Sequence, residues 1–315
     1  MVFSLEEIER FTQLYSGNII PLRVVLCSLT WVLYDYFETL EDEVRYIWSQ
    51  KRCVGKISYL FMRYYTILLL VFDVVQIHSF AIPGITSDAV CLAMDPTIRI
   101  LGAISLWSIE VIMQLRVYAL FDCSKKVAVF NGVMFIASII AFLALLIYNA
   151  QGRAALIASA VRLPLPGCPA INGGIGWALW LPASIYETIL FGFVVYKSSR
   201  SLTLKVRLGE RWSLGAIMVG DNMLYFLGIT VLLAFNNVMA AGAAKIIPWF
   251  SYGPFHAAMG IMTTRMLMHV RKLAAQTDAF AELSGDEVPG EHGEFDGTLP
   301  RFVDPAPLSV TCGEV

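Results

Sequence analysis

The chain has few charged side chains. Only 15% of its 315 residues are Asp, Glu, Lys or Arg, whereas soluble domains usually carry about 25%. Hydrophobic residues make up 57% of the chain, and its mean hydropathy is +0.65. A water-soluble domain of this composition would have too little polar surface to cover its core. The scarcity of charge therefore excludes an ordinary soluble fold and predicts a membrane protein.

The chain also lacks the short motifs of the common enzyme and metal-binding classes. It contains no G-x-x-x-x-G-K-[ST], H-E-x-x-H or G-x-S-x-G sequence, so nucleotide hydrolysis, zinc proteolysis and α/β-hydrolase chemistry have no starting point. No C-x-x-C pair occurs, and the four histidines are spread from residue 78 to residue 292. The net charge of -2 gives no support to nucleic-acid binding. We expect no catalytic site, no metal and no cofactor.

Long apolar runs take the place of the missing charge. A bilayer core of roughly 30 Å needs about 20 helical residues, and seven stretches of the sequence reach that length. Each is predicted to be helical, because backbone amides in hydrocarbon must be hydrogen-bonded within the segment. The predicted spans are residues 18–38, 57–81, 97–121, 127–148, 172–196, 213–235 and 246–265. The predicted fold class is all-α, an integral membrane bundle of seven transmembrane helices.

Lys and Arg residues concentrate in alternate loops between these spans. The first, third and fifth loops and the segment after the last span are rich in bases, and the other three loops are poor. Because positively charged loops stay in the cytosol, this predicts an N-terminus outside and a cytosolic C-terminus. Residues 1–17 form an extracytosolic N-terminus, residues 18–272 the membrane domain, and residues 273–315 an acidic tail that we expect to be disordered.

Two of the six cysteines lie on the predicted outer side. Cys91 precedes the third helix, and Cys168 lies in the loop that enters the fifth. Disulfides persist on that side of a membrane, whereas the cytosol keeps thiols reduced. A bond between them would fix a long loop over the mouth of the bundle, as a similar bridge does in rhodopsin-like receptors. The alternative is two unpaired thiols.

Three acidic residues fall near mid-depth of predicted helices: Glu110 in the third, Glu187 in the fifth and Asp221 in the sixth. A charge at that depth costs at least about 2.5 kcal/mol, so it normally faces a partner or a water-filled cavity. The three acids could bind a cationic ligand, a metal ion or a proton. Alternatively, Glu110 with Gln114, or Asp221 with Asn222, could hydrogen-bond between helices and fix their packing.

Two arginines lie nearer the cytosolic ends. Arg63 and Arg116 are both expected to extend along their aliphatic stems to the surface. Arg116 and Tyr118 form a candidate cytosolic switch, because the sequence Arg116-Val117-Tyr118 weakly resembles the Arg-Tyr switch of rhodopsin-like receptors. Leu115 stands where that switch has an acid, so the sequence does not assign the chain to that receptor class.

The first loop carries a further resemblance. The segment LEDEVRYIW at 40–48, followed by Lys51, Gly55, Lys56, Arg63 and Tyr64, resembles the N-terminal signature of a basidiomycete fungal family of multi-pass proteins, defined by a domain of unknown function. Similarity continues in LRVYALF at 115–121, near Asp221, and in TRMLMHVRK at 264–272. In similar proteins Arg and Gly flank the Asp of the sixth helix, whereas Gly220 and Asn222 do so here. The resemblance implies seven helices and a fungal membrane, and supplies no reaction.

Together these features predict a receptor-like sensor in the plasma membrane or an endomembrane. It would couple an unknown ligand, outside or in the lipid bilayer, to a cytosolic signalling protein. A proton- or ion-coupled transporter or channel that uses Glu110, Glu187 and Asp221 is the alternative. A membrane enzyme is the weakest interpretation, since no nucleophile and base can be paired in the sequence.

Overall fold

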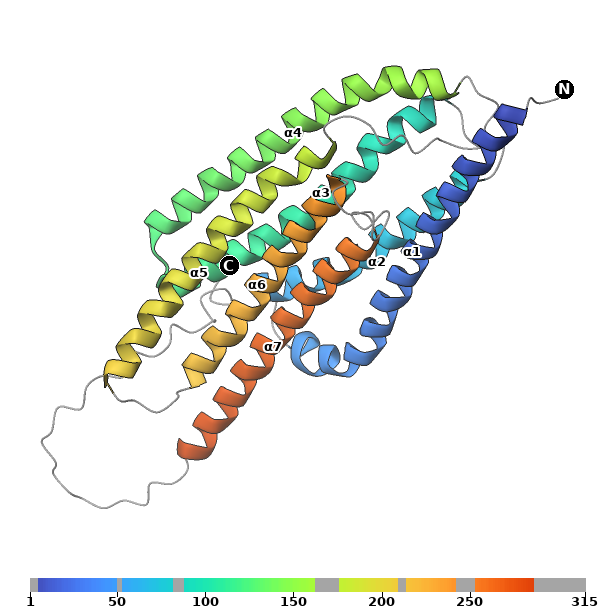
Figure 1. Cartoon of the computed structure of the whole chain (residues 1–315). Helices are drawn as coiled ribbons and strands as arrows, with labels where there is room; N and C mark the ends of the chain where they lie inside the picture. Colours follow the sequence, from blue (N-terminus) through green and yellow to red (C-terminus); the bar gives the residue numbers. More distant parts are fainter. Residues whose placement is uncertain are drawn as a thin grey trace, which may run out of the picture.

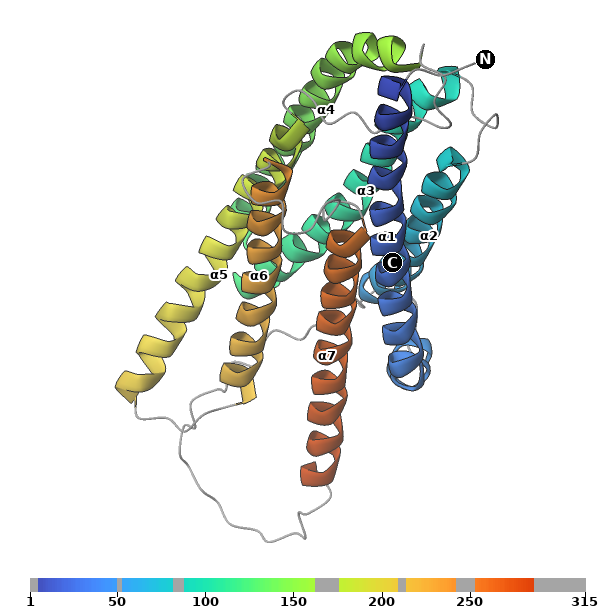
Figure 2. The same ribbon diagram turned by 45° about the vertical axis from the view of Figure 1, so that its right-hand side comes forward.

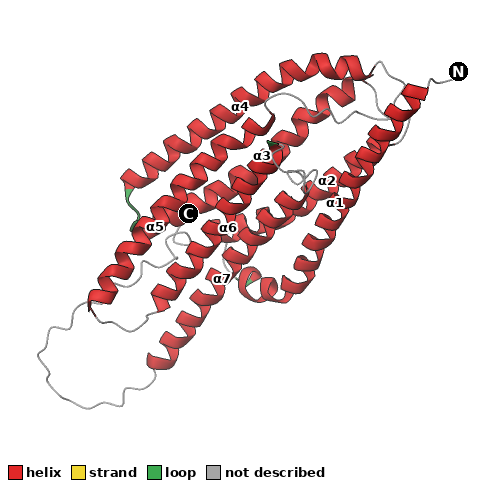
Figure 3. Ribbon diagram, in the orientation of Figure 1, coloured by secondary structure: helices red, strands yellow, loops and turns green. Residues whose placement is uncertain are grey.

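The chain folds into long helices. The computed structural model describes residues 5–49, 53–81, 88–161, 176–208, 214–241 and 253–285, with side chains near several helix ends left undescribed. The seven α-helices are α1 (Leu5–Glu43), α2 (Val54–Ala81), α3 (Asp88–Leu120), α4 (Lys125–Val161), α5 (Leu181–Leu208), α6 (Leu214–Ala240) and α7 (Gly253–Gly285). A π-helical turn (Val44–Trp48) follows α1, and a 3-10 turn (Gly176–Trp180) precedes α5. Figure 3 shows no strand within these ranges.

Five of the helices are long and apolar enough to cross a bilayer. Their candidate spans are Val54–His78, Pro96–Leu120, Lys125–Gly152, Trp177–Arg200 and Met223–Ala240. Large apolar side chains also point outward from them; Leu68, Val129 and Leu224, for example, are 66%, 67% and 65% exposed. Water would penalise such surfaces, whereas lipid tails accept them. The chain is therefore an all-helical, multi-pass integral membrane protein.

The helices form an elongated bundle with two sides. In Figures 1 and 2, α1 and α2 lie together at one edge, α4 and α5 lie at the other, and α7 runs between the two sides. The largest buried cluster joins α3, α5, α6 and α7, through side chains such as Met113, Leu190, Phe226 and Phe255. Leu70 of α2 belongs to a smaller cluster with α1 and α7. Helix α7 therefore contacts both sides of the bundle.

Each of the seven predicted spans overlaps one α-helix, and five of these helices, α1, α4, α5, α6 and α7, continue past the predicted C-terminal end of their span. Helix α1 continues from residue 38, where the first predicted span ended, to Glu43. Helix α7 continues to Gly285, past residue 272, where the predicted tail begins. Residues 273–282 read LAAQTDAFAE, which is rich in good helix formers, so helix propensity outweighs the acidic composition there. Residues 286–315 of the predicted tail lie outside the described residues.

The start of α7 follows from local backbone chemistry. Pro254 is its second residue, in the first turn, where a backbone N–H would have no intrahelical partner. Proline is therefore accommodated there without loss of a hydrogen bond. The seventh predicted span began at residue 246, and residues 242–252 lie outside the described residues.

Candidate functional site

The first polar feature is an ion pair between α1 and α2. Arg63 Nε lies 2.7 Å from Glu43 Oε2, and the two side chains are 5% and 0% exposed. The remaining guanidinium nitrogens donate hydrogen bonds to the Thr39 hydroxyl (2.7 Å), the Tyr59 hydroxyl (2.8 Å) and the backbone carbonyl of Tyr36 (2.7 Å). The expectation that Arg63 extends to the surface is therefore wrong. Its charge is satisfied inside the protein, where a carboxylate and three oxygen acceptors replace water.

The π-helical turn supplies further partners for Glu43. Trp48 Nε1 donates a 3.0 Å hydrogen bond to Glu43 Oε1, and the Tyr64 hydroxyl lies 3.4 Å from the same oxygen. A π-helix brings residues five apart into register, which is the spacing of Glu43 and Trp48. Lys56 Nζ donates to the backbone carbonyl of Trp48 at 3.0 Å. One carboxylate therefore connects α1, the turn and α2.

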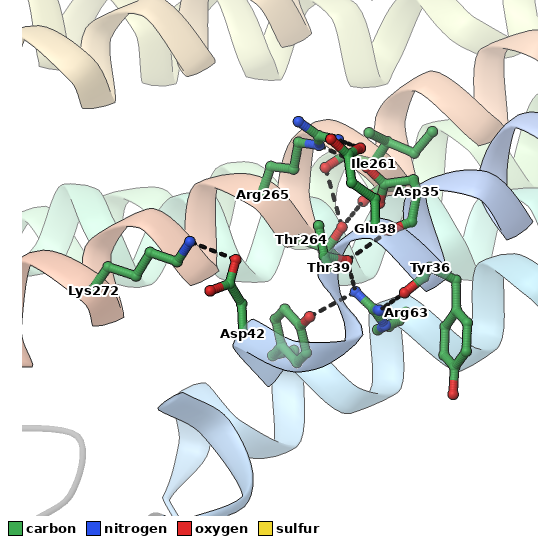
Figure 4. Close-up of polar contacts among 12 residues, drawn as sticks. Asp35, Tyr36, Glu38, Thr39, Asp42, Arg63, Ile261, Thr264, Arg265 and Lys272 are labelled. Atoms are coloured by element: carbon green, nitrogen blue, oxygen red, sulfur yellow. Dashed lines mark hydrogen bonds and ion pairs between the residues drawn. The ribbon is translucent and has the colours of Figure 1, made fainter. Parts of the chain in front are cut away.

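Helix α7 is attached to α1 by a second set of charges, the α1–α7 ion-pair row. Arg265 Nε lies 2.6 Å from Asp35 Oδ1, and its Nη2 lies 2.6 Å from Glu38 Oε2. Further along the same two helices, Lys272 Nζ lies 2.5 Å from Asp42 Oδ2. Figure 4 shows these side chains facing one another beside the Arg63 cluster. Arg265 and Lys272 are 46% and 36% exposed, so this row is far more accessible than the pair of Glu43 and Arg63.

A small hollow separates the two sets of charges. It lies between α1, α2 and α7 and is lined by Asp35, Arg63, Thr66, Gly260 and Thr264, among others. The hydroxyls of Thr66 and Thr264 bond to carbonyls of their own helices, at 2.7 Å to Met62 and 2.9 Å to Gly260. The charged groups of Arg63 and Asp35 are paired as described above, so the rest of the hollow is lined mainly by apolar groups, including the side chains of Val32, Ile67 and Ile261.

The second polar feature lies between α3 and α5. Glu110 and Glu187 are both 0% exposed, and none of their four carboxylate oxygens has a hydrogen-bond partner within the described part of the chain. The two carboxyl groups are close enough to interact electrostatically. The structure thus brings together two of the three acids that the sequence places at mid-depth. The alternative pairing of Glu110 with Gln114 is not among its hydrogen bonds.

For three other predicted site residues, Asp221, Cys91 and Cys168, the structure gives no side-chain position. Asp221 lies in α6 and Cys91 in α3, but their side chains are not described, and Cys168 lies outside the described residues. The third member of the acidic group and the disulfide therefore stay predictions.

Arg116 and Tyr118 make different contacts in the structure, and their role as a switch stays a prediction. Arg116 Nη2 lies 3.5 Å from the backbone carbonyl of Met266 in α7, at the outer limit of a hydrogen bond. Tyr118 lies at the end of α3, where its carbonyl accepts a 3.1 Å hydrogen bond from the backbone N–H of Cys123. Arg116 thus connects α3 to α7, while the contribution of Tyr118 is to the end of its helix.

Sequence reasoning missed the α1–α7 ion-pair row, although the sequence holds a signal for it. Asp35, Glu38 and Asp42 follow the i, i+3, i+7 spacing that places side chains on one helix face. Arg265 and Lys272 are likewise seven residues apart. The predicted spans ended at residues 38 and 265, so part of each face was assigned to a loop.

Comparison with known proteins gives one family match, over the segment that holds the buried ion pair of Glu43 with Arg63. Residues 24–68 match a family of unknown function, DUF6533. No curated protein matches the chain. The DUF6533 segment contains the α1 and α2 members of both sets of charges, including Asp35, Glu43, Trp48 and Arg63.

The match covers the part of the resemblance that begins at Leu40 and ends at Tyr64. In the structure, the residues of the DUF6533 segment form an α-hairpin whose two helices are joined by a buried ion pair. The fungal origin and the similarity of the later segments stay predictions.

Proposed function

We propose that this multi-pass membrane protein is a receptor-like sensor with seven spans, its N-terminus outside and its C-terminus in the cytosol. Five helices qualify as spans by length and composition alone. Helices α1 and α7 carry more charge, yet Asp35, Glu38 and Asp42 of α1 pair with Arg265 and Lys272 of α7. Paired charges cost less in a membrane than isolated ones, which supports α1 and α7 as the remaining two spans.

The observation that carries the proposal is the difference between the two attachments of α1. Its ion pair with α2 is buried, and removal of one partner of a buried pair typically costs about 3–5 kcal/mol. The pair of Arg265 with Glu38 is about half exposed and the pair of Lys272 with Asp42 is 36% exposed, a class worth roughly 0–1 kcal/mol each. Asp35, the second partner of Arg265, is 8% exposed. The ion pairs between α7 and α1 therefore resist movement of α7 less than the buried pair of Glu43 with Arg63 resists separation of α1 from α2.

A sensor needs such an element with two arrangements that a ligand can bias. With the predicted orientation, the α1–α7 ion-pair row lies toward the cytosol, the side to which the sequence also assigns the basic first and fifth loops. A shift of α7 would change the surface that a cytosolic partner contacts. Arg116 extends this coupling to α3, since it reaches the α7 backbone at Met266.

Proton- or ion-coupled transport, or a channel, is the second candidate, and the buried carboxyl groups of Glu110 and Glu187 favour it. Acids without partners at bilayer depth are a feature of proton and ion pathways. The two candidates differ in whether ions cross the membrane.

A liposome flux assay separates the candidates. Purified protein would be reconstituted with proton-, sodium- or potassium-sensitive dyes, and wild type would be compared with Glu110→Gln, Glu187→Gln and Asp221→Asn. The sensor proposal expects no flux in any of the four proteins. Flux in wild type that is lost in the variants would eliminate the sensor and establish transport.

Hydrogen–deuterium exchange in nanodiscs tests the movable helix directly. Combined substitution of Arg265→Ala and Lys272→Ala should raise exchange in the C-terminal half of α7 and leave α2 protected, because the lost pairs join α7 to α1, whereas the buried pair of Glu43 with Arg63 stays intact. Lys197→Ala is the matched control, since it removes the exposed 2.9 Å ion pair with Asp122 at the α3 and α5 side. Equal loss of protection in α7 and α2 would show that the helices move as one unit and would contradict the proposal.

A further inference from the structure

The carboxyl groups of Glu110 and Glu187 have no compensating charge. Both side chains are fully buried, and each lies near the middle of its candidate span, in α3 and α5 respectively. No basic side chain within the described ranges pairs with either acid. Two negative charges in an apolar interior repel each other and cannot both persist without a counter-charge.

The charged and titratable groups of the surrounding helices confirm this isolation. On α4 the only described bases are Lys125 and Lys126, which are exposed in its first turn. The described side chains of α6, residues 223–241, include no charge. His256 of α7 packs against Gly102, two turns before Glu110 on α3.

The bases nearest to the two acids along α3 and α5 are also engaged elsewhere. Arg116 of α3 reaches toward the carbonyl of Met266 in α7. On α5, Lys197 pairs with Asp122 near the helix end. None of these groups supplies the positive charge that the two acids lack.

Neutral polar groups without partners accompany the two acids. Tyr186, next to Glu187, interacts electrostatically with both carboxyl groups and lies beside the Gln114 side chain. Its hydroxyl donates a 3.3 Å hydrogen bond to the backbone carbonyl of Asn131 in α4. Asn131 is 2% exposed, and neither its Oδ1 nor its Nδ2 has a partner in the described part of the chain. Three neighbouring helices, α3, α4 and α5, therefore carry buried polar atoms without described partners, which is more than packing requires.

We propose that Glu110 and Glu187 bind exchangeable small cations, either protons or alkali-metal ions, that neutralise the two carboxylates. The oxygens shown at the pair are all hard donors: four carboxylate oxygens, with the Tyr186 hydroxyl close enough to interact with both groups. Such a set suits a proton or an alkali-metal ion and lacks the thiolate and imidazole ligands that zinc and copper prefer. Occupancy of this site is compatible with either a sensor or a transporter, so the inference stands without the proposed function.

Infrared difference spectroscopy on the reconstituted protein tests the site without a flux measurement. In one arm the pH is stepped at constant sodium chloride concentration. In the other, choline chloride is exchanged for sodium or potassium chloride at constant pH. We expect one of the two steps to change carboxyl or carboxylate bands in wild type, and this change to be lost in both Glu110→Gln and Glu187→Gln. A response to the pH step identifies protons, and a response to the salt step identifies an alkali-metal ion.

Two further sets of variants guard against artefacts. Glu41→Gln, which removes an exposed acid of α1, should leave the bands unchanged. Glu110→Asp and Glu187→Asp keep a carboxyl group and should shift the bands instead of removing them, with the amide I band confirming an intact helical fold. Wild-type bands that respond to neither step, or that survive both Gln variants, would overturn the proposal. A response lost in only one Gln variant would show a single acid at work and would overturn the pair.

Discussion

Buried ionisable side chains in this protein have two contrasting environments: one is fully hydrogen-bonded and paired, and the other has no described partner. Arg63 is surrounded by a carboxylate, two hydroxyls and a carbonyl, and its guanidinium also lies 4.6 Å from the centre of the Tyr36 ring. Glu110 and Glu187 have no such partners within the described residues. A charge whose hydrogen-bonding groups all have partners stabilises one conformation, whereas a buried ionisable group without partners is a candidate binding site. We therefore assign a structural role to the first group and a binding role to the second.

The structural role of Arg63 predicts a large loss of stability when it is removed. Arg63→Met would leave Glu43 buried without its counter-charge, and we expect a loss of about 3–5 kcal/mol. Denaturation of the purified protein, followed by circular dichroism during titration with SDS, would measure it.

A double variant and a control make this result specific. Addition of Glu43→Gln to Arg63→Met should recover part of the loss, because it removes the uncompensated carboxylate. Arg45→Ala, at an exposed position of the π-helical turn, should change stability by only about 0.5 kcal/mol. Unchanged denaturation of Arg63→Met would show that the buried pair does not hold the hairpin together.

For individual residues, the sequence identifies which side chains are unusual but not what they contact. Glu110 and Glu187 stand out because any acid in an apolar run does, and the structure brings them together. Arg63 also stood out, but its partner Glu43 lies twenty positions earlier, across a turn whose π-helical winding the sequence pattern does not reveal. A snorkelling arginine and a buried, paired one look alike in the sequence.

Among the helices, a close contact between α2 and α7 depends on a glycine. A Cβ atom on Gly260 would lie 2.5 Å from Thr66 Oγ1 and 2.6 Å from its Cγ2, closer than real contacts allow. Small residues permit such close packing of helices in membranes, where dispersion contacts replace the hydrophobic effect. Gly260 therefore fixes how near α7 lies to α2, beside the hollow and the Arg63 cluster.

Substitution of this glycine should separate the two helices. We expect Gly260→Ala to cost about 1–3 kcal/mol, because the added methyl group overpacks the contact with Thr66. Thermal unfolding in detergent, monitored by tryptophan fluorescence, would show the loss. Gly192→Ala in α5 is the matched control. A Cβ atom there would meet no described atom of another helix within 4 Å, and alanine favours helix over glycine by up to about 1 kcal/mol.

A compensating change completes this test. Gly260→Ala combined with Thr66→Ala moves a methyl group from one helix to the other and should restore most of the lost stability. Equal unfolding temperatures for Gly260→Ala and wild type would mean that α2 and α7 are not in close contact at this position.

The existence of each helix could be predicted from the sequence, whereas the helix ends could not. Apolar runs of about 20 residues locate the seven helices, because a bilayer admits few other structures. The ends of α1 and α7 extend beyond those runs, because their polar faces pair with each other and because residues 273–282 favour helix. The first of these causes is a contact between distant segments and the second is helix propensity, and a scan for apolar runs detects neither.

For the whole molecule, polar contacts divide the bundle into two functional regions. The DUF6533 hairpin and α7 carry paired charges, whereas α3, α4 and α5 surround the unpaired acids. Helix α7 is the link, since Arg116 of α3 reaches its backbone at Met266, one residue from Arg265. Cation binding between α3 and α5 could therefore be transmitted to the α1–α7 ion-pair row through α3 and α7. The predicted disulfide bond between Cys91 and Cys168 would link the N-terminal end of α3 to the loop that leads into α5, on the predicted outer side.

The seven-span topology makes a prediction that tags at the chain ends alone cannot test. If only the five most apolar helices crossed the bilayer, the two termini would still lie on opposite faces, because five is also an odd number. The side of the membrane on which the first loop lies distinguishes seven spans from five. With seven spans, an N-terminal tag lies outside and Ser49, exposed just after the π-helical turn, lies in the cytosol. With five, both lie on the same face.

Labelling of intact cells would distinguish the two arrangements. We expect an N-terminal epitope tag to bind antibody without permeabilisation, whereas a C-terminal tag should bind only after it. A membrane-impermeant maleimide should likewise reach Ser49→Cys only after permeabilisation, with wild type giving the background of the native cysteines. Labelling of Ser49→Cys in intact cells whose N-terminal tag is accessible would place both ends of α1 on one face. In that case the acids of α1 and the bases of α7 would pair at the membrane surface, and α7 could not transmit a signal across the bilayer through them.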